Sequence, residues 1–168
     1  APSLEILDTR ILRVDPETNA KRKIFDTISD NAANAGIVLG SERHAADGID
    51  LRWVGVIASS NGEVEETGLG AGVLNDPIES VVWLARRMTK YKQTIQPGHT
   101  VLSGSFIRPI ECQSGTAIHA DFGSFGSVDI CMCVCARWDC VCMCMSTSVC
   151  MCWSVRMCVC VVACVWAL

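Results

Sequence analysis

The composition of the chain changes abruptly near Ile130, and this change constrains the fold more than any other feature. Residues 1–130 hold 29 of the 32 charged residues and a single cysteine, Cys112. Residues 131–168 hold the other eleven cysteines and only three charged residues. A chain of 168 residues suits one globular domain. We therefore predict a domain over residues 1–130, followed by a low-complexity Cys/Val/Met tail over residues 131–168.

The charge balance of residues 1–130 excludes several classes of partner. This part carries 12 Lys and Arg against 17 Asp and Glu. No nucleic-acid partner is expected, because a phosphate backbone requires clustered positive charge. One cysteine does not make a disulfide scaffold, so a cytoplasmic location is expected. The first ten residues also lack the charged and then apolar segments of a secretory signal.

The tail begins with Cys-Met-Cys-Val-Cys and repeats such runs. A soft-metal cluster uses converging thiolates, but the spacers here are Met, Val and Trp. The clear pairs in the tail are Cys-x-Cys and not the Cys-x2-4-Cys pairs usual for structural zinc. The longest run without charge, residues 140–155, is shorter than a membrane span of about 18 residues. No membrane partner is expected, although a soft-metal-binding or membrane-associated module stays open as an alternative. We favour an aberrant, non-native tail, of the kind that a translated TG-rich repeat encodes.

Residues 1–130 read as mostly strands with one or two helices, which is a mostly β (α+β) class. Asn61-Gly62 predicts a hairpin, because a type I′ turn needs positive φ at both central residues. Asn75 or Asp76 caps a helix that starts at Pro77. The buried stripe of that helix is expected to be Ile78, Val81, Val82, Ala85 and Met88. Further strands are expected at residues 3–14, 37–39, 100–103 and 117–122, and a last strand ends at residue 130. A short helix is expected near residues 24–36.

Several motifs that resemble functional sites have simpler structural explanations. Glu63-x-Glu65 follows the hairpin turn, where alternate residues form a solvated face. Gly68-x-Gly70-x-Gly72 lacks the spacing and the lysine of a phosphate loop, so we interpret it as a flexible strand end. Cys112 is interpreted as an inert buried thiol. The three histidines, His44, His99 and His119, are scattered along the sequence. They therefore give little support to a nucleophilic triad.

Glu5 stands out because it lies in an apolar segment. A carboxylate there is costly unless a metal ion or a cation partners it. Arg10 is the candidate cation, and the residues alone leave both explanations open. A second polar cluster contains Lys23, Asp26 and Asp30. Taken together, these residues suggest a fragment of an acidic metal site.

Several motifs of the sequence resemble those of one enzyme family. The segments Leu-Glu-Ile-Leu-Asp-Thr-Arg (residues 4–10) and Arg-Lys-Ile-Phe-Asp-Thr-Ile-Ser-Asp-Asn-Ala-Ala-Asn-Ala-Gly (residues 22–36) are similar to the 2-oxo-hept-4-ene-1,7-dioate hydratases. Shorter matches continue in order to residue 130, among them Gly-Ser-Phe-x-Arg-Pro at residues 104–109. These enzymes lie in the fumarylacetoacetate hydrolase superfamily, beside the 2-keto-4-pentenoate hydratases and the oxalocrotonate decarboxylases. The resemblance identifies residues 1–130 with the C-terminal part of such an enzyme.

The resemblance implies a fumarylacetoacetate-hydrolase-like β-roll or barrel fragment, a Mg²⁺ or Mn²⁺ cofactor and a homo-oligomeric parent. It also implies a small 2-oxo or 2-hydroxy dienoate substrate, hydrated in aromatic-compound degradation. A decarboxylase or C–C hydrolase of the same superfamily is the near alternative. Family members hold the metal with an upstream Glu-x-Glu pair and one further glutamate, which Glu5 matches. The pair and a Lys-x-Gly-Leu-Thr-Ser motif are expected upstream of Ala1.

Two further residues correspond to the substrate side of the family's site. Lys23 matches a lysine that precedes Phe-Asp-Thr, and Ser105 lies in the substrate-side loop. With no catalytic residue retained and two metal ligands missing, the chain is expected to be an inactive lyase fragment.

Overall fold

The computed structural model describes residues 1–45 and 47–132, and beyond them the backbone of strands at residues 133–135, 140–144, 150–153, 157–162 and 165–167. Within this part the strands form three sheets. Their orders are β2-β1-β11-β6, β10-β9-β8-β7-β3-β4 and β12-β5. Only two α-helices accompany them, so the mostly β architecture is confirmed for the described residues.

The four-stranded sheet carries β1 in its interior, paired with β2 on one side and β11 on the other. Its strands are β1 (Ser3–Leu7), β2 (Asn34–Leu39), β6 (Ile110–Cys112) and β11 (Met157–Val162). Leu4 and Ile6 on β1 are both 0% exposed, and they enter the core. The strand predicted at residues 3–14 is therefore too long, because the chain leaves the sheet after Leu7.

The six-stranded sheet lies against the other side of this core. It contains β3 (Gly55–Ser60), β4 (Glu63–Leu69), β7 (Ala117–Asp121), β8 (Ser127–Cys135), β9 (Cys140–Cys144) and β10 (Cys150–Trp153). Asn61 and Gly62 have φ of 51° and 90°, which confirms the hairpin between β3 and β4. Alternate residues of β3, β7 and β8 share one buried apolar cluster with Leu4 and Ile6 of β1.

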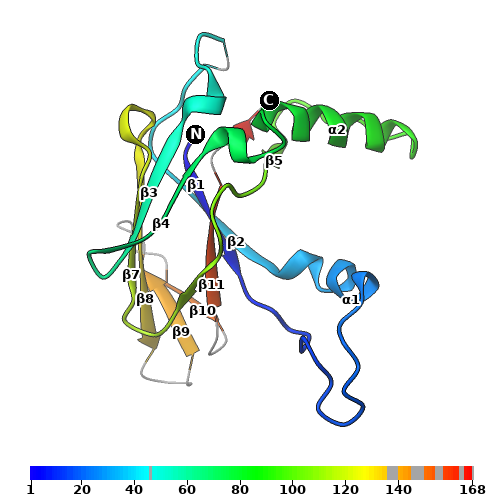
Figure 1. Cartoon of the computed structure of the whole chain (residues 1–168), viewed down its shortest axis with the longest axis vertical. Coiled ribbons are helices and arrows are strands. Elements are labelled where there is room, and N and C mark those ends of the chain that lie inside the picture. The colour runs from blue at the N-terminus through cyan, green and yellow to red at the C-terminus, as the bar shows by residue number, and fades with distance from the viewer. Residues whose placement is uncertain (46, 136–139, 145–149, 154–156, 163–164, 168) are drawn as a thin grey trace.

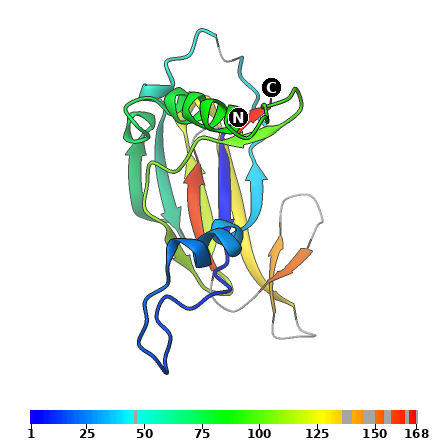
Figure 2. The ribbon, with the colours of Figure 1, turned by 90° about the vertical axis from the view of Figure 1, so that its right-hand side faces the viewer.

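Both helices lie on the side of the four-stranded sheet, away from β3 and β7 (Figures 1 and 2). The predicted start of α2 (Pro77–Thr89) is confirmed, since the Asp76 carboxylate accepts the Ile78 N–H at 2.9 Å. The predicted buried stripe of α2 is not buried: Ile78 is exposed, and Val81, Val82, Ala85 and Met88 are half-buried. Pro77 is the one buried residue of the helix. The shorter helix α1 (Ile24–Ser29) exposes Ile24, Phe25 and Ile28. The remaining strands are β5 (Thr100–Leu102) and β12 (Val165–Ala167).

The predicted boundary at residue 130 falls inside β8, which runs without interruption from Ser127 to Cys135. The division of the chain into a domain and a tail stays a prediction. The hypotheses of a soft-metal cluster or a membrane-associated module concern the tail at residues 131–168, in which the side chains beyond residue 132 lie outside the described residues. Within the described part, no helix has the length and apolar character needed to cross a membrane.

Candidate metal and substrate site

Glu5 lies in the middle of β1, on the face opposite Leu4 and Ile6, and is half-buried. Its Oε1 accepts a hydrogen bond of 2.6 Å from the Asn34 side-chain amide at the start of β2. Arg10 is not its partner, so the proposed neutralisation of Glu5 by Arg10 is wrong. Among the described residues, Glu5 Oε2 has no hydrogen-bond partner and no cation neutralises the carboxylate.

Arg10 instead pairs with Asp30, just after α1. Its Nε donates to Asp30 Oδ1 at 2.6 Å, and its backbone N–H donates to Asp30 Oδ2 at 3.1 Å. The Asp30 side chain is only 2% exposed. The hydrogen bond from the Arg10 guanidinium is the main reason why the pKa of Asp30 lies below its ordinary value. This pair fastens α1 to the end of β1 and keeps Asp30 ionised.

The turn between Asp30 and β2 is left-handed over three consecutive residues. Asn31, Ala32 and Ala33 have φ of 51°, 55° and 63°. The Ala33 carbonyl accepts the Asp8 N–H at 2.8 Å, which ties the turn to the chain beyond β1. Such a backbone costs an L-residue about 1–2 kcal/mol, and strain of this kind concentrates at functional sites. The turn leads directly into Asn34.

Lys23 and Ser105 lie on other elements. Lys23 is exposed at the start of α1, where its backbone N–H donates to the Asp26 carboxylate at 2.7 Å. The Ser105 hydroxyl lies in the loop between β5 and β6 and donates to the Ile107 carbonyl at 2.8 Å. Within the described residues, no hydrogen bond or ion pair joins Glu5, Lys23 and Ser105. The structure therefore places the three predicted site residues without bringing them into contact.

The chemistry of Glu5 suits a hard divalent cation, because Mg²⁺ and Mn²⁺ prefer carboxylate oxygens. A complete site needs further ligands, and in the described part of the chain no three Asp, Glu, His or Cys side chains gather as a metal site. Glu5 thus fits as one ligand of a site that the described residues do not complete.

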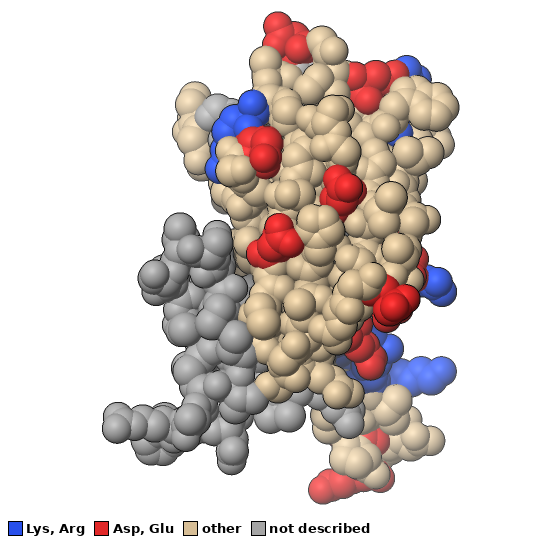
Figure 3. Space-filling model, turned by 90° about the vertical axis from the view of Figure 1, so that its left-hand side faces the viewer, with Lys and Arg blue, Asp and Glu red and all other residues tan. Residues whose placement is uncertain are grey.

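Glu63 and Glu65 lie on β4 at the edge of the other sheet, and both are exposed, as the solvated-face interpretation predicts. Glu66 forms an ion pair of 2.8 Å with Arg108. On the face of the molecule turned away from the helices, carboxylates lie scattered over a largely uncharged surface (Figure 3). Among the described residues, these acids gather into no second metal site at the hairpin.

Gly68, inside β4, and Gly70, directly after it, are packed closely, so the interpretation of this glycine run as a flexible strand end is wrong. A Cβ at Gly68 would meet the Phe106 carbonyl and lie 2.8 Å from Ile107 Cγ2. A Cβ at Gly70 would overlap the Leu51 carbonyl. Glycine is needed at these positions because neighbouring backbone approaches closely. Thr67, Gly68, Leu69, Ala71, Gly72 and Phe106 line an open hollow of about 600 Å³.

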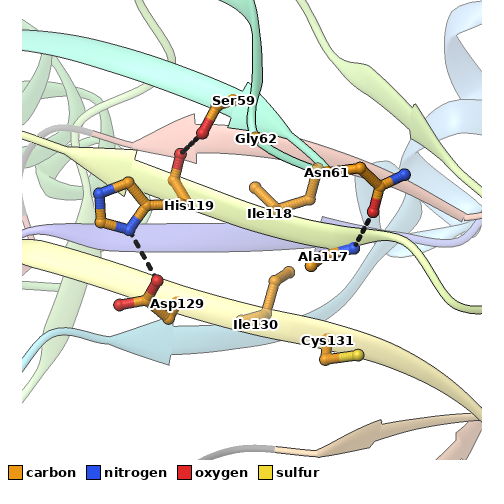
Figure 4. Close-up of a pocket in the computed structure, with 9 residues that line it drawn as sticks. All are labelled: Ser59, Asn61, Gly62, Ala117, Ile118, His119, Asp129, Ile130 and Cys131. Atoms are coloured by element: carbon orange, nitrogen blue, oxygen red, sulfur yellow. Dashed lines mark hydrogen bonds and ion pairs between the residues drawn. The ribbon is translucent and has the colours of Figure 1, made fainter.

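A second open hollow, of about 610 Å³, lies over β3, β7 and β8 (Figure 4). Strand register places Ser59, His119 and Asp129 in one cross-strand row on it. His119 Nδ1 lies 2.6 Å from Asp129 Oδ1, but the Ser59 hydroxyl donates to the His119 backbone carbonyl at 3.4 Å. This row is therefore not a nucleophile–base pair. The sequence did not predict the His119–Asp129 contact. Alternation along a strand shows which residues share a face, but only the register shows that His119 lies opposite Asp129.

The comparisons with known proteins agree with this fold. No family model matches the chain. It is 47% identical over 127 residues to 2-oxo-hept-4-ene-1,7-dioate hydratase from Escherichia coli, covering 76% of this chain and 48% of that enzyme. It is 35% identical to 2-keto-4-pentenoate hydratase from Paraburkholderia xenovorans (strain LB400), covering 76% and 45%. It is 30% identical to 4-oxalocrotonate decarboxylase from Pseudomonas putida, covering 76% and 46%.

A solved structure of 4-oxalocrotonate decarboxylase from Pseudomonas putida G7, complexed with magnesium and adipate, has the same fold. The TM-score is 0.63 at 24% identity, over 76% of this chain and 59% of that one. By sequence, the chain is similar to these hydratases and to the decarboxylase over about 127 residues. The resemblance to the 2-oxo-hept-4-ene-1,7-dioate hydratases that the sequence motifs indicate is confirmed. The chain spans about half the length of the curated relatives that it matches.

Proposed function

We propose that this chain is part of a hydro-lyase that adds water to a 2-hydroxy-2,4-dienoate of the 2-oxo-hept-4-ene-1,7-dioate type, in aromatic-compound degradation. The sequence identity of 47% over 127 residues to such a hydratase supports the substrate class. The single structural observation that carries the proposal is the half-buried Glu5. Its carboxylate is oriented by Asn34 and, among the described residues, has no cation beside it.

In this proposal Glu5 provides one carboxylate ligand to Mg²⁺ or Mn²⁺. When bound, such a cation stabilises negative charge on the 2-oxo group of the substrate as that group becomes enolate-like. Glu5 keeps its place because Leu4 and Ile6, on either side of it, are fully buried. Since the described residues offer no complete ligand set, the chain by itself is expected to be inactive.

Lys23 and Ser105 are the proposed substrate-binding residues. The Lys23 ammonium group is exposed and suits one of the substrate carboxylates. Ser105 would exchange its hydrogen bond to the Ile107 carbonyl for one to the substrate. A homo-oligomeric parent enzyme and a cytoplasmic location belong to the same proposal.

A chimeric enzyme tests the proposal directly. Residues 1–130 of this chain replace the matching segment of the Escherichia coli hydratase, and loss of the dienoate absorbance is followed with added Mg²⁺. We expect hydration, and a loss of about 10²-fold or more for Glu5→Gln, the size of a lost electrostatic contact to the reacting group. Glu65→Gln is the matched control, because Glu65 is an exposed strand carboxylate, and it should leave the rate unchanged. Full activity of the Glu5→Gln chimera would contradict the role of Glu5.

The decarboxylase relatives make decarboxylation of a 2-oxo acid the second candidate function, supported by the 30% identity to 4-oxalocrotonate decarboxylase. Both reactions use the same kind of charge stabilisation at a 2-oxo group. The chimera separates them by product, since only decarboxylation releases CO₂. Release of CO₂ without hydration would replace the first proposal by the second.

A further inference from the structure

Asn34 reaches Glu5 because β2 contains a β-bulge. In the β1–β2 pair, Glu5 lies opposite Ile37 and Ile6 lies opposite Gly36, but Leu7 lies opposite Asn34 instead of Ala35. With uninterrupted register, Asn34 would point to the other face of the sheet, because side chains alternate along a strand. The additional residue moves Asn34 to the face that carries Glu5, and bulges often redirect side chains in this way beside active sites.

The hydrogen bond between the two side chains is directional. An ionised carboxylate only accepts hydrogen bonds, so the NH₂ group of Asn34 faces Glu5. The 2.6 Å distance between Asn34 Nδ2 and Glu5 Oε1 indicates a charge-assisted bond. The bond holds one carboxylate oxygen and leaves the other without a partner among the described residues. A metal ligand that is oriented by a neighbour in this manner binds its cation more tightly.

Hydrogen bonds from Arg10 also restrain the backbone of Asn34. The Arg10 guanidinium Nη2 donates to the Asn34 carbonyl at 3.2 Å and to the Asp30 carbonyl at 3.0 Å. The left-handed turn at residues 31–33 lies between these two carbonyls. The Arg10–Asp30 pair and the strained turn therefore restrict the backbone from which the Asn34 amide extends.

We propose that Asn34 is a positioning residue for Glu5, which it orients so that the second carboxylate oxygen can bind a divalent cation. The bulge at Ala35 and the hydrogen bonds from Arg10 set the position of Asn34. This inference rests on the proposed function, in which Glu5 is a metal ligand. It assigns no contact between Asn34 and the substrate.

Mn²⁺ binding to this chain, followed by paramagnetic broadening of NMR signals, tests the inference without measuring catalysis. Broadening of the Glu5 and Ile37 backbone amides reports binding at Glu5, even when that binding is weak. We expect Asn34→Ala to weaken the apparent Mn²⁺ affinity at these amides by about tenfold, the lower end of the range for residues that orient a ligand. Asn75→Ala is the matched control, because Asn75 is exposed and distant in sequence from Glu5. Asn75 has a positive φ of 67°, so replacing it by alanine should lower stability without removing a contact to Glu5.

The outcomes separate the two proposals. Equal broadening in wild type and Asn34→Ala would overturn the positioning role and leave Glu5 as a ligand. No broadening near Glu5 in the wild-type chain would overturn the metal role of Glu5, and the inference with it. If Asn34→Ala does not fold, Asn34→Val serves in its place, because valine suits a strand and also lacks the donor. The same weakening in Asn34→Val, with dispersed amide signals, supports the positioning role.

Discussion

Replacing Ala32 by glycine should stabilise the protein, although this change destabilises most structures. Ala32 is exposed and has φ of 55° and ψ of 28°, inside the left-handed turn before β2. The left-handed conformation costs an L-residue about 1–2 kcal/mol. Glycine avoids that cost but loses about 0.5–1 kcal/mol more than alanine through conformational entropy. The difference predicts a gain of about 0.5–1 kcal/mol.

The assay is urea denaturation at pH 7, with the thermal midpoint as a second measurement. A gain of about 1 kcal/mol corresponds to about 2–4 °C for a chain of this size. Ala85→Gly, in the middle of α2, is the matched control and should lose about 1 kcal/mol. The change from alanine to glycine should thus raise the free energy of unfolding at position 32 and lower it at position 85. If Ala32→Gly destabilises the protein as much as Ala85→Gly does, the strained turn does not exist in solution.

Two further predictions concern the Arg10–Asp30 pair and the start of α2. The Arg10 guanidinium holds the pKa of Asp30 below its ordinary value of 3.8. The pair therefore stabilises the fold above that value, and this contribution is lost as the pH falls through the lowered pKa. In urea denaturation at pH 7, Asp30→Asn should have a lower free energy of unfolding than wild type, and this difference should shrink at about pH 2. A difference of the same size at both pH values would argue against an ionised Asp30. Asp76→Ala removes the hydrogen bond to the Ile78 N–H and should lower the free energy of unfolding by about 1 kcal/mol. Equal urea midpoints for wild type and Asp76→Ala would contradict the capping role of Asp76.

Local features of the fold were predictable where a few neighbouring residues determine the backbone. Asn61-Gly62 predicts the hairpin because these two residue types accept positive φ, and the structure has it. Asp76 followed by Pro77 predicts the start of α2 for a similarly local reason. The length of β1 was not predictable in this way. Beyond Leu7 the chain contacts residues distant in sequence: the Asp8 N–H donates to the Ala33 carbonyl, and Arg10 pairs with Asp30, twenty residues further along the chain.

The candidate site shows the same division. The apolar neighbours of Glu5 were sufficient to mark its carboxylate as exceptional, because an ionised group there needs a partner. The identity of that partner was not predictable: Arg10, one of the two explanations left open, pairs with Asp30 instead. Asn34 contacts Glu5 because of one additional residue in β2. A shift of one residue reverses the face of every side chain in a strand.

The sequence by itself indicated the resemblance to the hydratases through motifs spread along residues 1–130. It also predicted the hairpin turn and the α2 cap and singled out Glu5 as a carboxylate in an apolar segment, because these features depend on residue types at short spacing. Only the tertiary structure decided which side chains meet: Asn34 with Glu5, Arg10 with Asp30, and His119 with Asp129. The physical reason is that these contacts depend on strand register and on a bulge. Register follows from the packing of the whole apolar core, in which Leu4 and Ile6 of β1 are buried together with residues of β3, β7 and β8.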